Sequence, residues 1–143
     1  MKERFRFLEH TADAYIESYG SNLEEAFENA ALGMTDVMTK LETIEAIVEE
    51  SFIVEAQDEY ALLYSWLEEL LLEFELKDML YSRFEVFSIE ETVKGFRLCA
   101  KAWGEKYNPD THPSKVGIKA ATYHQMEILK DPGSVILRFI LDI

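Results

Sequence analysis

The strongest pattern in the sequence is a run of apolar residues at helical spacing that begins shortly after Asp58. Apolar positions recur every three or four residues and therefore share one helix face: Leu62, Leu63, Trp66, Leu67, Leu70, Leu71 and Phe74. Asp58 offers a side-chain oxygen for the helix N-cap. The pattern predicts a long amphipathic helix, whose apolar face other elements must cover.

A second helix is predicted directly after Gly20. Ser21 is followed three residues later by Glu24, which is the spacing of a capping box. One helical face then collects the apolar residues Leu23, Ala26, Phe27, Ala30, Ala31 and Met34. We expect this helix to end between residues 33 and 36.

Segments rich in β-forming residues surround the two helices, at 4–8, 14–19, 43–56, 83–90, 95–104, 115–130 and 134–143. Polar runs such as EETVK and the Asp131-Pro132-Gly133 turn are typical of hairpins. Two helices among about seven strands predict an α+β fold. We expect residues 1–143 to form a single-domain two-layer sandwich with a mostly antiparallel sheet.

The charge balance restricts the classes of partner. Fourteen Lys and Arg residues against twenty-eight Asp and Glu residues give a formal net charge of −14. Such a surface disfavours direct binding to nucleic acids and to anionic membranes, and favours a basic protein partner or a cation. The N-terminal sequence lacks the apolar run of a signal peptide, and Cys99 alone cannot form an intrachain disulfide. We therefore expect a cytoplasmic protein with no membrane span.

Common catalytic motifs do not occur in the sequence. It has no Gly-rich phosphate loop and no GxSxG, CxxC or HExxH spacing. His10, His112 and His124 are too widely spaced for a local zinc motif, and each is more simply explained as a turn or sheet residue. The usual enzyme classes are thus unsupported.

Two acidic positions stand apart from the many glutamates of the helix faces. Asp13 lies in the turn of LEHTADAYIE, between two predicted strands, where it could also cap the turn. Asp142 and the carboxylate of Ile143 end an apolar strand. Clustered anions attract a cation, bind a basic side chain or share a proton, and hard cations prefer oxygen ligands. A frayed terminus in water is the alternative.

Five stretches together resemble the archease family. They are HTAD at 10–13, GSNLEEAFENAALGM at 20–34, WLEELL at 66–71, KAATYH at 119–124 and DI at 142–143. They follow the family's order and extend over essentially the whole chain. The departures are Ala121, where a larger β-branched residue is more usual, and Glu68, where asparagine often stands.

The resemblance implies a small cytosolic, non-catalytic cofactor of the RtcB-type RNA ligase of tRNA splicing. Such a cofactor promotes the GTP-dependent guanylylation of the ligase's active-site histidine and multiple turnover, and broadens the nucleotides used. The family's metal-binding positions carry over to Asp13, Asp142 and Ile143. Calcium is the ion expected there, with magnesium or manganese as alternatives. The resemblance leaves open the role of Lys119 and the oligomeric state.

Two other functions remain as alternatives. One is a general chaperone or a modulator of nucleic-acid methyltransferases, which requires exposed apolar patches. The other is a metal-dependent hydrolase that uses Asp13 and Asp142, which requires an open metal position and a positioned water. The sequence offers no phosphate-binding partner for hydrolysis. His10 is expected to shape its turn rather than bind the ion.

Overall fold

The computed structural model describes residues 3–9 and 13–143. In chain order, this part of the protein contains β1 (Phe5–Leu8), β2 (Ala14–Gly20), α1 (Leu23–Met38), a 3-10 helix (Leu41–Thr43), β3 (Val48–Ala56), α2 (Glu59–Lys77), β4 (Met79–Thr92), β5 (Gly95–Lys106), β6 (Ala120–Ala121), β7 (Glu127–Asp131) and β8 (Ser134–Asp142). The predicted α+β class with two main helices is confirmed. Neither helix is long and apolar enough to cross a membrane, as far as the chain is described.

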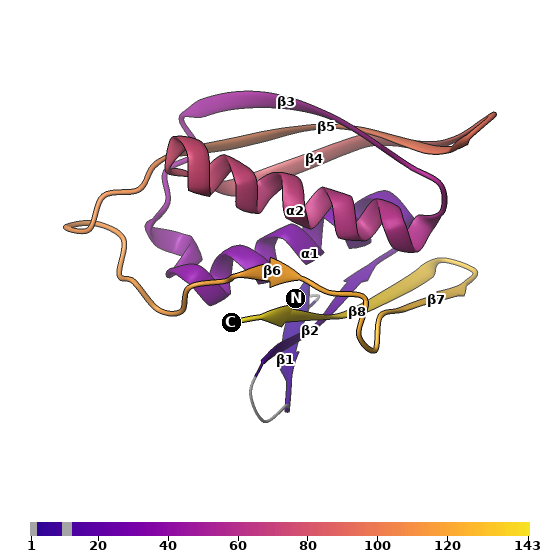
Figure 1. Cartoon of the computed structure of the whole chain (residues 1–143), viewed down its shortest axis with the longest axis horizontal. Helices are drawn as coiled ribbons and strands as arrows, with labels where there is room; N and C mark the ends of the chain where they lie inside the picture. Colours follow the sequence, from indigo (N-terminus) through magenta and orange to yellow (C-terminus); the bar gives the residue numbers. More distant parts are fainter. Residues whose placement is uncertain (1–2, 10–12) are drawn as a thin grey trace.

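The strands form two antiparallel sheets rather than one. The first has the order β1-β2-β8-β6, and β7 pairs with β8 as well; the second has the order β3-β5-β4. Both helices lie between these sheets (Figure 1). Helix α1 packs on β2 and β4, one strand from each sheet, whereas α2 packs on the β3-β5-β4 sheet and on β6. The apolar helix faces predicted from the sequence are therefore covered from two sides.

Trp66 joins these layers at the centre of the core. Its side chain is fully buried, and its indole N–H donates to the carbonyl oxygen of Phe27 on α1 at 3.1 Å. Its ring makes edge contacts with Phe52 of β3 and Phe84 of β4, with centroids 5.8 and 6.0 Å away. The hydrogen bond satisfies the only polar atom of a large apolar side chain, so the tryptophan can be buried at little cost.

The helix boundaries differ in detail from those predicted. Asn22, not Ser21, caps α1, because its Oδ1 accepts the N–H of Glu25 at 2.8 Å. Glu25, not Glu24, is the acid that folds back over this end, and it accepts the N–H of Ser21, the residue before the cap. Both positions lie one residue later than expected, and α1 continues to Met38. The N-cap predicted at Asp58 of α2 is confirmed by its bond from the N–H of Ala61.

The strand predictions fail mainly in the long segments. The segment predicted as a strand over 43–56 yields β3 only from Val48, after the 3-10 helix. Residues 115–130 form two short strands, β6 and β7, because residues 107–119 run as a connection without helix or strand. Strand β4 contains two register shifts, one between Tyr81 and Arg83 and one between Val86 and Ser88.

A buried carboxylate links the first three strands of the larger sheet. Glu17 of β2 is only 3% exposed. It receives hydrogen bonds from Arg138 of β8 and from the hydroxyl of Tyr19, and pairs with Arg6 of β1 at 3.0 Å. Burial raises the pKa of Glu17, but these hydrogen bonds and the two guanidinium charges outweigh it, so the pKa lies below 4.5.

We predict that Glu17→Gln destabilises the protein by about 1–3 kcal/mol at pH 7, because the carboxylate charge facing two guanidinium groups is lost. A carboxyl with a lowered folded-state pKa stabilises above its unfolded pKa and loses this effect as the pH falls. The difference in unfolding free energy, measured with urea, should therefore shrink below pH 4.5. The control Glu127→Gln removes a half-exposed partner of Arg138 and should cost less than about 1 kcal/mol. Equal losses in both variants would contradict this account.

Candidate metal site at the ends of strands β2 and β8

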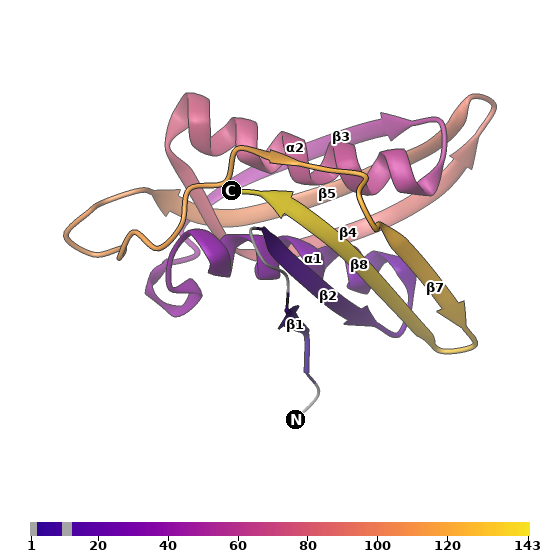
Figure 2. The ribbon, with the colours of Figure 1, turned by 60° about the horizontal axis from the view of Figure 1, so that its bottom comes forward.

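The antiparallel pairing of β2 with β8 brings two predicted site residues to one end of the larger sheet. The register of this pair runs from Gly20 opposite Val135 to Ala14 opposite Leu141. Asp13 directly precedes this last pair on one strand, and Asp142 directly follows it on the other. Neighbouring strands lie about 4.8 Å apart. Figure 2 shows the start of β2 beside the end of β8 and the C-terminus.

The end of β8 is held on its other side as well. Ala120 of β6 pairs with Asp142, and the N–H of Lys119 donates to the carbonyl oxygen of Asp142 at 2.8 Å. Strand β6 is in turn fixed to α2, because Glu68 accepts the N–H of Ala121 at 2.7 Å. The last residues of β8 thus lie between two strands. The frayed terminus considered from the sequence does not describe this structure.

Asp13 and Ile143 line the same cavity of about 270 Å³. Its walls also include Asp36 and Lys115, together with apolar residues of β1, α1 and the 107–119 connection. Asp142 is not part of this wall, and its side chain is exposed. The structure therefore joins two of the three predicted positions in one cavity and places the third next to them along the strand.

Lys115 and Asp36 were not predicted from the sequence. The ammonium of Lys115 donates to the carbonyl oxygen of Asp36 at 2.6 Å and lies 3.9 Å from its carboxylate. The main-chain N–H of Lys115 donates to Met38 at 3.0 Å. Lys115 thus places a positive charge at the C-terminal end of α1, where the helix dipole favours it. No local motif reveals this, because the two residues are 79 positions apart.

The chemistry of the site suits a hard cation. Asp13, Asp142 and Ile143 would offer carboxylate oxygens, the ligand type that calcium and magnesium prefer. Among the residues that the structure describes, no three His, Cys, Asp or Glu side chains gather in a geometry able to hold a metal ion. A complete ligand set would therefore depend on the terminal carboxylate of Ile143 and on main-chain or water oxygens. The three metal ligands stay a prediction.

The histidines play different parts. His112 is buried; its Nδ1 accepts the N–H of Asn108 at 2.9 Å, and its Nε2 lies 2.8 Å from Glu105. A main-chain N–H can only donate, so the Nδ1 is unprotonated and the Nε2–H donates to the carboxylate. His112 therefore fixes the start of the 107–119 connection. His124 is exposed in a turn, and His10 lies outside the described residues.

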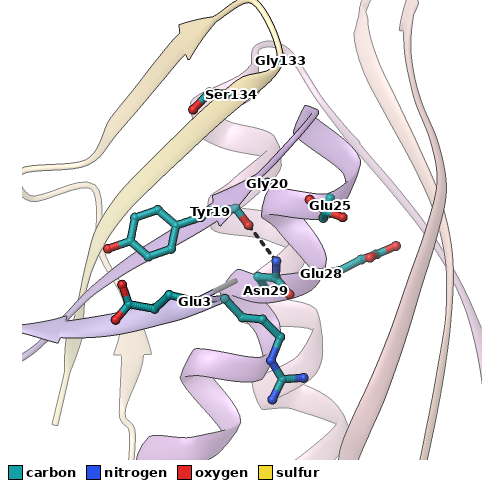
Figure 3. Close-up of a pocket in the computed structure, with 9 residues that line it drawn as sticks. Glu3, Tyr19, Gly20, Glu25, Glu28, Asn29, Gly133 and Ser134 are labelled. Atoms are coloured by element: carbon teal, nitrogen blue, oxygen red, sulfur yellow. Dashed lines mark hydrogen bonds between the residues drawn. The ribbon is translucent and has the colours of Figure 1, made fainter. Parts of the chain in front are cut away.

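A separate cavity of about 410 Å³ lies near the other end of α1 and contains several acidic side chains (Figure 3). Two of its polar side chains already form hydrogen bonds with main-chain groups. Glu28 accepts the N–H of Val86 at 2.7 Å, and Asn29 donates to the carbonyl oxygen of Tyr19 at 2.6 Å. Burial raises the pKa of Glu28 above its usual value. We interpret this region as a junction between the two sheets rather than as a cation site.

The model of the Archease protein family (MTH1598/TM1083) matches residues 5–143. The protein archease of Sulfurisphaera tokodaii is 43% identical over 141 residues, which are 99% of each chain. That of Sulfolobus acidocaldarius is 44% identical over 140 residues, which are 98% of this chain and 99% of that protein.

A solved structure supports the same relationship. The solution structure of Methanobacterium thermoautotrophicum protein 1598 superimposes with a TM-score of 0.84 at 42% sequence identity. The match covers 97% of this chain and 98% of the other. Similarity in sequence and fold thus extends over nearly the whole length of both proteins, and the chain belongs to the archease family.

Proposed function

We propose that this protein is a non-catalytic, cytoplasmic cofactor of an RtcB-type RNA ligase in tRNA splicing. In this role it promotes the GTP-dependent guanylylation of the ligase's active-site histidine, sustains multiple turnover and broadens the nucleotides that the ligase accepts. Membership of the archease family supports an archease role. Two points go beyond family membership and are proposed: the ligase is the partner, and guanylylation is the step that this protein promotes.

The proposed site consists of Asp13, Asp142 and Ile143, with calcium as the bound ion and magnesium or manganese as alternatives. The observation that carries it is the shared cavity of Asp13 and Ile143 at the paired ends of β2 and β8. Both residues are attached to a sheet whose register is set along the full length of β2. Carboxylates held by such a sheet need little reorganisation to bind an ion.

The strands and charges around the proposed site determine how it would meet a partner. Pairing of β8 with β2 and β6 orients the C-terminus, while the ammonium of Lys115 supplies one positive charge within the cavity. A bound divalent ion would add positive charge at the tip of an otherwise acidic protein. The net charge of −14 favours approach to a basic or cation-rich surface of the ligase. There the carboxylates could position or exchange a metal ion before the next guanylylation.

The alternative, a general chaperone or methyltransferase modulator, finds weaker support. Ile53, on the outer face of the β3-β5-β4 sheet, is 71% exposed. Ile53 of β3 lies opposite Cys99 of β5. The next pair on the same face is Glu55 and Arg97, whose side chains form an ion pair. Charged pairs thus interrupt the apolar surface that promiscuous binding would use.

The role of Asp13 can be tested in a ligation assay with the cognate ligase. Asp13→Asn keeps the shape of the side chain but removes its charge, and should abolish multiple turnover while leaving single-turnover ligation by pre-guanylylated ligase intact. Asp131→Asn removes the same charge from the end of β7 and should leave turnover unchanged. Normal turnover with Asp13→Asn would refute the proposed site.

The terminal carboxylate can be tested by calorimetric titration with calcium. Residues appended after Ile143 convert its carboxylate to an amide, which removes one anionic oxygen ligand. We expect calcium affinity to fall about tenfold or more. The same residues added before Met1 are the matched control and should not change the affinity. If the C-terminal extension leaves calcium affinity unaltered, Ile143 is not a ligand.

A further inference from the structure

The outer face of the β3-β5-β4 sheet lies on the opposite side of the molecule from β8 and the C-terminus, and both helices lie on its inner side (Figure 1). An apolar row crosses the middle of this face, from Ile53 on β3 through Cys99 on β5 to Phe87 on β4. Phe87 lies at a register shift of β4, and its ring centroid is 6.0 Å from the ammonium of Lys101 on the same face. Ile53 is 71% exposed and Phe87 is 52% exposed. Large apolar side chains exposed together on one face indicate a site of contact with another protein.

The outer face is nearly neutral, although the whole chain carries a formal net charge of −14. The register places four carboxylates and three cations on it, which gives a net charge of −1: Glu49, Glu55, Glu85, Glu90, Arg83, Arg97 and Lys101. Two copies of so acidic a chain repel each other over most of their surface, and they meet with least repulsion where both contribute this face. A basic partner would be attracted more strongly by the acidic remainder of the surface. The charges therefore favour a second copy of the chain on the outer face.

One row of the outer face carries opposite charges on its two edge strands. Trp103 of β5 lies in the middle of this row, opposite Glu49 of β3 and Arg83 of β4. Its indole N–H donates to the carboxylate of Glu49 at 3.1 Å, and the guanidinium of Arg83 lies 4.4 Å from the centroid of its ring. The tryptophan thus holds an anion at one edge of the face and a cation at the other. A second copy turned by half a rotation would bring each charge over its opposite.

We propose that two copies of this chain associate through their outer faces, about a twofold axis that runs parallel to β5. Such an axis lays β3 of one copy over β4 of the other and keeps each row in place. Glu49 of one copy then faces Arg83 of the other, and Ile53 faces Phe87. Cys99 lies near the axis, opposite Cys99 of the second copy, with the stacked sheets about 10 Å apart.

The size of the outer face predicts a weak dimer. Strand β3 has nine residues, so the face measures roughly 30 Å along the strands and roughly 14 Å across three of them. Such a footprint is at the lower end of the range for specific interfaces. We expect a dissociation constant on the order of 10⁻⁵ M. Both candidate metal sites would lie on the far sides of the dimer, and the proposal does not depend on the ligase role.

Sedimentation velocity of the full chain tests the dimer, over concentrations from about one tenth to ten times the expected dissociation constant. We expect a reversible passage from monomer to dimer. Ile53→Ser removes a central apolar contact and should weaken dimerisation about tenfold or more. The matched control is Leu76→Ser, because Leu76 is also 71% exposed but lies on α2, and it should leave dimerisation unchanged. A chain that stays monomeric leaves the face to a different partner and overturns the proposal, as do equal effects of the two variants.

A charge swap tests the proposed axis. Glu49→Arg and Arg83→Glu, each alone, place like charges opposite each other and should each weaken dimerisation about tenfold or more. The double variant restores opposite charges between the copies and should regain the wild-type affinity within about threefold. This rescue distinguishes a contact between copies from a general loss of stability. If both single variants dimerise normally, or if the double variant stays as weak as they are, the axis is wrong.

Cys99, the only cysteine of the chain, reports on the axis directly. Dibromobimane links two nearby thiols, as each thiolate displaces one bromide, and becomes fluorescent once both have reacted. We expect a fluorescent covalent dimer of the wild-type chain. The control combines Cys99→Ser with Ser134→Cys, which moves the cysteine to an exposed position on the other sheet, and should give no covalent dimer. A wild-type chain that dimerises without this cross-link would contradict the arrangement.

Discussion

The pairing of β2 with β8 is the contact on which the rest of the structure depends, because it joins two strands more than a hundred residues apart. Burial of apolar side chains and one buried ion pair set the register of this strand pair, because a one-residue shift would disrupt both. Ile16 and Phe139, opposite each other and fully buried, would move to the outer face, and Glu17 would leave Arg138. The position of Asp13 next to the end of β8 is therefore a consequence of core packing and of a buried ion pair. The same register would determine the ligands of the proposed ion.

Segments between the helices and the C-terminus add a second set of long-range contacts around this end of the sheet. Glu68 of α2 binds the main chain of β6, and Lys119 binds the main chain of Asp142. His112 and Lys115 fix the connection that leads to β6. These contacts assign structural roles to two of the family-like stretches, WLEELL and KAATYH. Glu68, a departure from the usual asparagine, still offers an oxygen that accepts the N–H of Ala121.

The predictions from sequence were accurate where local physics decides the outcome. The apolar period from Leu62 to Phe74 predicts α2, and Asp58 is its cap, because helix periodicity and capping involve only nearby residues. The cap of α1 was misplaced by one residue, since Ser21 and Asn22 are both good cap residues and only tertiary structure selects one. The division into two sheets was not predictable in this way, because strand partners such as β2 and β8 are chosen by packing between distant segments.

In the candidate site, too, local sequence patterns predict some features, whereas others depend on contacts between distant segments. Asp13, Asp142 and the carboxylate of Ile143 stand out in the sequence as unusual acidic positions, and the resemblance to the archease family implies that they are metal ligands. The fold brings Asp13 and Ile143 into one cavity. Lys115 carries no local signal, because its significance depends on the end of α1 and on the connection that packs against it. Local patterns thus indicate which residues are unusual, whereas the three-dimensional structure is needed to know which of them meet.

The central claim is that the paired ends of β2 and β8 hold a divalent cation. A crystal of the full chain grown with terbium in place of calcium tests it directly, through the anomalous scattering of the ion. We predict a strong peak about 2.3–2.6 Å from carboxylate oxygens of Asp13, Asp142 and Ile143. A peak found only among the acidic residues near the start of α1, or no peak at saturating terbium, would contradict the account.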